Sequence, residues 1–180
     1  MSIVLDGTSG ITSPSVTGTP VIGGLVSGTA VASTSGTSID FTGIPSWVKR
    51  ITVMFAGVST SGTSFWQIQV GDSGGIESSG YSGAFSGMDS GVGTNLLTTG
   101  FGVRSGSAAN IIYGQIFISS MGENLWAAAG VLSSTAGAAG SSFLTSGTKT
   151  LSDTLDRIRI TTVNGTDTFD AGSINIIYEG

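Results

Sequence analysis

Between residues 38 and 180, large apolar side chains recur at every second position in short runs that clusters of Gly and Ser separate. The run 157–161 is the sharpest example, because Ile158 and Ile160 alternate with Arg157 and Arg159. Alternation with period two places the apolar side chains on one face of an extended strand, whereas a helix needs a period of 3.6. The pattern therefore predicts an all-β chain in which most strands bury one face.

Six runs with this pattern are predicted strands, namely 49–55, 65–70, 110–119, 125–132, 157–161 and 173–178. Gly and Ser clusters at 57–62, 71–75, 87–93 and 137–147 are predicted turns. Several short strands with turns between them are typical of an antiparallel β-sandwich, here expected to be jelly-roll-like. The expected inner faces consist of Ile51, Val53, Phe55, Trp66, Ile68, Val70, Ile158, Ile160, Ile174 and Ile176.

Residues 1–35 have a different composition, rich in Gly, Ser and Thr and with two of the three prolines. Ordering a backbone costs about 1–2 kcal/mol per residue, and this segment has too few large apolar side chains to offset that cost by itself. We therefore expect an extended N-terminal assembly arm (1–35) that binds a neighbouring chain, followed by a sandwich domain (36–180). The side chains expected to be buried against the neighbour are Ile3, Leu5, Ile11, Val21, Ile22 and Leu25.

The chain contains neither cysteine nor histidine. Ser-His-Asp and Cys-His relays, disulfides and the usual zinc sites are therefore excluded. Six Lys and Arg residues are too few to neutralise many phosphates, so nucleic-acid binding is not expected. With 9% charged residues and a net charge of −5, the surface should consist mainly of hydroxyls and amides, which suits a protein that functions in an assembly. No cofactor or metal is expected.

Four carboxylates near the end of the sequence, Asp153, Asp156, Asp167 and Asp170, raise the question of glycan hydrolysis, which uses a pair of acidic residues. Carboxylates are also ordinary turn residues, and Asp167 and Asp170 flank an Asn164–Gly165 pair that predicts a hairpin turn. The turn interpretation is favoured, and we do not expect an enzyme.

Aromatic side chains offer a second kind of candidate site, because exposed rings can stack on sugars. Trp66 lies on an alternating strand and is expected in the core. Trp47 follows Pro45 at the margin of a strand, and Tyr81 lies between Gly and Ser residues. These two are the residues expected to face a ligand.

Two segments carry a resemblance to a known family. Residues 41–55, FTGIPSWVKRITVMF, resemble the opening of a C-terminal domain of phage tail-fibre and related virion proteins, and residues 155–179 resemble the close of the same domain. The segment 5–12, LDGTSGIT, is similar to short repeats of fibre shafts. The resemblance implies a β-rich, usually trimeric, non-enzymatic module on the outside of a phage particle.

Three functions remain open from the sequence. The chain is expected to be a trimeric tail-fibre or receptor-binding module of a tailed bacteriophage, made in the host cytoplasm and located in the virion. Its expected partners are copies of itself, other virion proteins and a host surface glycan or protein, with no membrane insertion. The alternatives are a capsid decoration or cement protein or head fibre, and a glycan depolymerase.

Overall fold

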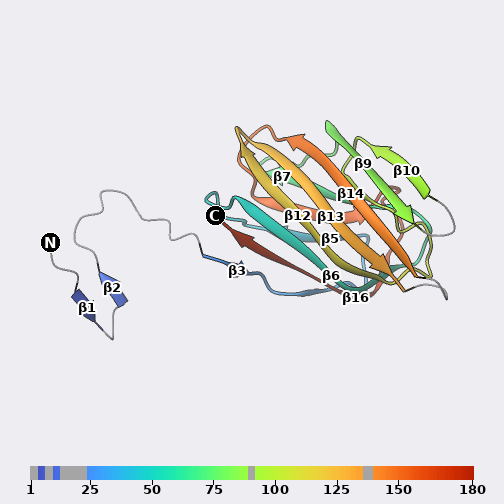
Figure 1. The fold of residues 1–180 in the computed structure, drawn as a ribbon, viewed down its shortest axis with the longest axis horizontal. Coiled ribbons are helices and arrows are strands. Elements are labelled where there is room, and N and C mark those ends of the chain that lie inside the picture. The colour runs from blue at the N-terminus through green and yellow to red at the C-terminus, as the bar shows by residue number, and fades with distance from the viewer. Residues whose placement is uncertain (1–3, 7–9, 13–23, 89–91, 136–139) are drawn as a thin grey trace.

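The computed structural model describes residues 4–6, 10–12, 24–88, 92–135 and 140–180. In these ranges the chain forms strands without helices, and the described residues from 24 onward form two antiparallel sheets packed face to face (Figure 1). The prediction of an all-β antiparallel sandwich is confirmed.

The larger sheet has the strand order β10-β9-β14-β13-β12-β6-β16-β3, and β4 pairs with β16 beside β3. Its strands are β3 (Val26–Ser27), β4 (Val31–Ala32), β6 (Arg50–Thr60), β9 (Tyr81–Met88), β10 (Val92–Leu97), β12 (Ile112–Gly122), β13 (Leu125–Ser134), β14 (Ser141–Thr150) and β16 (Phe169–Glu179). Neighbouring strands are antiparallel throughout, so one face of the sheet can be apolar while the other contacts solvent.

The smaller sheet has the order β11-β7-β15-β5, with β8 paired to β7. Its strands are β5 (Ser38–Thr42), β7 (Trp66–Asp72), β8 (Gly75–Ile76), β11 (Phe101–Val103) and β15 (Arg157–Thr162). Near the N-terminus, β1 (Val4–Asp6) and β2 (Gly10–Thr12) form a separate two-stranded hairpin in which Leu5 is opposite Ile11.

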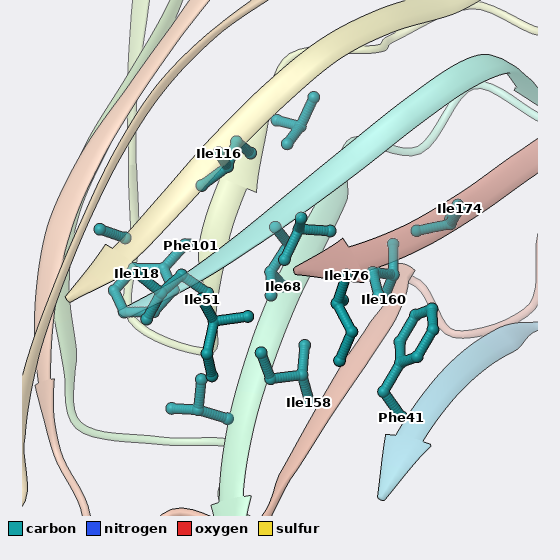
Figure 2. Packing of buried hydrophobic residues seen from close by; sticks show 14 of the residues in the cluster. Phe41, Ile51, Ile68, Phe101, Ile116, Ile118, Ile158, Ile160, Ile174 and Ile176 are labelled. Atoms are coloured by element: carbon teal, nitrogen blue, oxygen red, sulfur yellow. The ribbon is translucent and has the colours of Figure 1, made fainter. Parts of the chain in front are cut away.

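The core lies between the two sheets, where Figure 2 shows isoleucines of β6, β7, β12, β15 and β16 packed together. All ten side chains predicted for the inner faces are buried. Trp66 is the largest of the fully buried side chains, and its indole N–H donates to the Thr60 hydroxyl at 3.1 Å. Because that polar group has a partner, the ring can be buried without the cost of an unsatisfied donor.

The turn predicted for 137–147 is wrong in its second half, which belongs to β14. Gly147 lies opposite Gly83 of β9, and a Cβ on Gly147 would lie 2.9 Å from the Gly83 Cα. The ring of Phe101 would be 3.3 Å away from the same Cβ. Glycine is therefore needed at this position for close packing within a strand, and a Gly-rich composition alone does not separate that need from a turn.

The hairpin predicted at Asn164–Gly165 is also wrong, because β15 belongs to the smaller sheet and β16 to the larger one. Residues 163–168 cross from one sheet to the other. The local turn chemistry was predicted correctly, since the Asn164 side-chain oxygen accepts hydrogen bonds from the amides of Thr166 and Asp167 and Gly165 has φ +69°.

The second part of the predicted arm belongs to the sandwich. Strands β3 and β4 pair with β16, the amide of Ser33 donates to the carbonyl of Gly172, and the Ser33 hydroxyl donates to the carbonyl of Ala171 at 2.8 Å. The expectation that all of 1–35 depends on a neighbouring chain is therefore wrong for this part. Leu25, at 71% exposure, has its side chain in solvent.

The remaining arm residues are less fully described. Leu5 and Ile11 lie in the β1–β2 hairpin, while Ile3, Val21 and Ile22 lie outside the described residues. Their burial against a neighbour stays a prediction.

Two truncated proteins distinguish the contributions of the two parts of the arm to stability. Removing residues 1–35 deletes β3, β4 and the buried Ser33, and should lower the free energy of unfolding by about 1–3 kcal/mol. Removing residues 1–23 should change it by less than about 0.5 kcal/mol. Urea unfolding at low protein concentration measures both, and equal stability of the two truncated proteins would contradict the pairing with β16.

Candidate interaction surfaces

The two ends of the sandwich carry different segments of the chain. At one end, here called the arm end, residue 24 leads into β3 beside Tyr178, so the segment 1–23 joins the sandwich there. The opposite end, here called the far end, carries the loops 33–37, 61–65, 104–111 and 163–168. Figure 1 shows the arm end on the left, where β3 begins and β16 ends.

Ser64 connects three loops of the far end. Its amide donates to Oδ2 of Asp167 at 2.9 Å, its hydroxyl accepts from the amide of Asn164 at 3.1 Å, and its carbonyl accepts from the hydroxyl of Ser105 at 3.2 Å. The end of β13 joins the network through Ser134, whose hydroxyl donates to the side-chain oxygen of Asn110 in the loop 104–111 at 3.1 Å. Side chains and backbone thus fix these loops relative to one another.

Asp167 is the charged residue of this network. The hydrogen bond from the Asn164 amide group, at 2.7 Å, and that from the Ser64 amide lower the pKa of Asp167 below its ordinary value of 3.8. Gly62 leaves room for the carboxylate, since a Cβ there would overlap it. The negative charge of Asp167 is therefore stabilised by hydrogen-bond donors within the protein.

Apart from Arg104 and Asp167, the side chains of the loops 33–37, 61–65, 104–111 and 163–168 are neutral. Most exposed side chains of these loops are hydroxyls and amides, and the apolar Ile111 and Val163 are moderately exposed. Asp170 accepts a hydrogen bond from Ser59, and Arg104 donates to the carbonyl of Gly87 at 3.0 Å. The surface thus consists mainly of positioned neutral hydrogen-bonding groups, and the charged groups of Arg104, Asp167 and Asp170 each have a partner within the protein.

The two aromatic residues predicted to face a ligand are not brought together. Tyr81 is 3% exposed, its hydroxyl donates to the Glu77 carbonyl at 2.9 Å and accepts from the Val70 amide at 2.8 Å, and burial raises its pKa. The prediction for Tyr81 is therefore wrong. Tyr81 follows a Gly/Ser stretch but begins β9, where its ring packs edge-to-face on Phe101.

Trp47 is half-buried in the loop before β6 and packs on Tyr178, with ring centroids 5.9 Å apart. It lies at the arm end, near the junction with the segment 1–23. Its exposed part is therefore placed for contact near the arm, and its predicted ligand contact stays a prediction.

A polar cluster at the arm end was missed by sequence reasoning. Lys149, with its side chain 7% exposed, forms an ion pair with Glu77 and lies 5.6 Å from the Tyr81 ring centroid. The single hydroxyl proton of Ser152 is shared between Asp72, at 2.6 Å, and Glu77, at 2.8 Å. The cluster ties the segment after β14 to the segment after β7. Lys149 occurs in a run of Thr, Gly and Ser, which gave no signal of burial.

The four carboxylates considered for hydrolysis fall into two groups. Asp153 and Asp156 precede β15, whereas Asp167 and Asp170 follow it. Six residues of strand span about 20 Å, while hydrolytic pairs are about 5–9.5 Å apart. Asp156 pairs with Arg157, and Asp153 accepts from the Thr154 amide. No group of three or more metal-ligating acidic side chains occurs in the described ranges.

Comparisons with protein-family models, with curated proteins and with solved structures find no match. The residues that the structure describes include no helix that could span a membrane.

The Lys149–Glu77 ion pair predicts a pH dependence of stability. Burial alone would raise the pKa of Glu77, but the hydrogen bonds from Lys149 and Ser152 outweigh it and lower the pKa below the ordinary value of 4.5. Because the folded protein holds fewer protons than the unfolded chain, this stabilisation is present above pH 4.5 and is lost as the pH falls through the lower, folded value.

Glu77→Gln should therefore show a smaller loss of unfolding free energy between about pH 6 and about pH 3 than the unmodified protein, measured by urea unfolding. Glu123→Gln, on the exposed turn after β12, is the control and should keep the full pH dependence. An unchanged pH dependence in Glu77→Gln would contradict the assigned role.

Proposed function

We propose that this chain is a non-catalytic structural protein of a tailed bacteriophage virion, a tail-fibre or receptor-binding module that acts as a homotrimer. The resemblance of residues 41–55 and 155–179 to a virion domain motivates the proposal. The structural observation that carries it is the separation of the two ends: the arm joins at one end, and the positioned, mainly neutral loops lie at the other.

The length of the strands sets the distance between the two ends. Strands β6, β12 and β16 each have 11 residues, and a strand of that length spans roughly 35 Å. A module held through the segment 1–23 would carry the far-end loops away from its point of attachment. That is the arrangement needed to present a surface outward from a particle.

The chemistry of the far end suits binding of a host surface glycan or protein. Most of its groups are hydroxyls, amides and small apolar side chains, of which the polar ones can exchange hydrogen bonds with sugar hydroxyls, and its charged groups Arg104, Asp167 and Asp170 already have partners in the protein. Its loops are already connected through Ser64, so less conformational entropy is lost on binding. The carboxylates of this end are engaged by Ser59, Ser64 and Asn164, which supports a binding role rather than hydrolysis.

Labelling of intact phage particles that carry this chain tests the proposal. An antibody against the recombinant protein, detected with gold particles by electron microscopy, should mark the tail or its fibres. Labelling of the capsid face would instead identify a decoration protein. Particles without any label, with the antibody verified against the denatured virion proteins, would overturn the virion assignment.

A further inference from the structure

The outer face of the larger sheet is uncharged across six neighbouring strands. One row of cross-strand neighbours consists of Thr52, Phe117, Ala129, Ser146, Ala84 and Leu96, on β6, β12, β13, β14, β9 and β10 in turn. The adjacent row consists of Met54, Gln115, Val131, Leu144, Ser86 and Thr94. Among the described residues, neither row contains an acidic or basic side chain.

The charged residues of these strands lie at the margins or point inward. Arg50 pairs with Glu179 of β16 at the arm end. Asp170 is bound by Ser59 near the far end, and Lys149 is buried in the cluster with Glu77. The centre of the face is therefore free of the charges that usually keep an exposed sheet in solution.

Large apolar side chains are exposed on this face. Val131 is 59% exposed, and Phe117 and Leu144 are exposed to a lesser degree beside it. Together with the small side chain of Ala129 they line a hollow of about 470 Å³ on the sheet surface. A contiguous exposed apolar area of this kind marks an interaction site more often than a solvated surface.

The smaller sheet differs from the larger one because its outer face carries charged residues. On the outer face of the smaller sheet, Arg159 forms a two-bond ion pair with Asp40, and Arg157 pairs with Asp156. A partner covering that face would have to desolvate these ions or match them. The uncharged face of the larger sheet imposes no such requirement.

We propose that the outer face of the larger sheet is the contact surface between copies of this chain, with a second copy as its occupant. The six strands span roughly 29 Å at about 4.8 Å per strand, and eight residues of strand add about 26 Å in length. This gives an area on the order of 800 Å² per chain, which is the size that a standard stable interface buries on each partner.

The absence of charge on this face is compatible with the same occupant. Each copy carries a net charge of −5, and contact through uncharged faces places no like charges directly against each other. The same uncharged face on a second copy is such a surface, and its exposed Phe117, Val131 and Leu144 can fill the hollow beside Ala129.

This inference rests on the proposed function in that it names the partner of the assembling module. Its test uses the purified chain of 180 residues and no particle, so it can fail independently of the virion assignment. An assembly of two copies, with the whole face of each chain against the other, would keep the contact surface and contradict the trimer. Three copies, with each face divided between two neighbours about a threefold axis, would support both.

Light scattering after size-exclusion chromatography measures the assembly. Interfaces of standard size give affinities of micromolar or tighter, so at about 100 µM the chain should elute as a multimer. Val131→Glu should weaken association at least about tenfold, because the contact would bury an unpaired carboxylate. Leu144→Lys is the second variant and should act in the same direction.

The matched control is Val163→Glu, which adds the same charge at a 41% exposed valine of the far end and should leave the assembly unchanged. Circular dichroism and thermal unfolding establish that each variant is folded. A monomer at about 100 µM would overturn the proposal, since a micromolar interface would be saturated there. So would a multimer that neither Val131→Glu nor Leu144→Lys weakens.

Discussion

Burial of one apolar face from each sheet, with isoleucine and aromatic side chains meeting between them, is the interaction on which the rest of the structure depends. Each fully buried side chain of this kind contributes roughly 1.5–3 kcal/mol before conformational entropy is subtracted. Because alternate residues of a strand point to opposite sides, this core fixes which side chains face outward. The ion pairs and loop networks are built on the frame that the core provides.

The residues that make the core could be predicted from the sequence, because Ile158 and Ile160 alternate sharply with two arginines. Strands β9, β10 and β14 could not be predicted in the same way, since Gly, Ser and Ala interrupt their alternation. In β14 the reason is visible at Gly147, where a side chain would collide with β9. Small residues in this protein serve close packing as well as turns, and composition does not separate the two.

The errors at the candidate site have a common physical cause, namely contacts that the local sequence pattern does not encode. Tyr81 is buried because Glu77 and Val70 bind its hydroxyl and Phe101 packs on its ring. The far-end network depends on Ser64 meeting Asn164 and Asp167, about a hundred positions away in the chain. Local patterns predicted the turn at Asn164 but carried no information about which strand would follow it in space.

In the proposed assembly the arm end provides attachment, the far end binds a host ligand and the outer face of the larger sheet contacts other copies. Electron cryomicroscopy of the intact particle tests this account most directly, because it places all three surfaces at once. The account predicts copies on the outside of the particle with their uncharged sheet faces in contact and the loops around Ser64 directed outward. Copies whose larger sheets face solvent, with charged surfaces in contact instead, would contradict it.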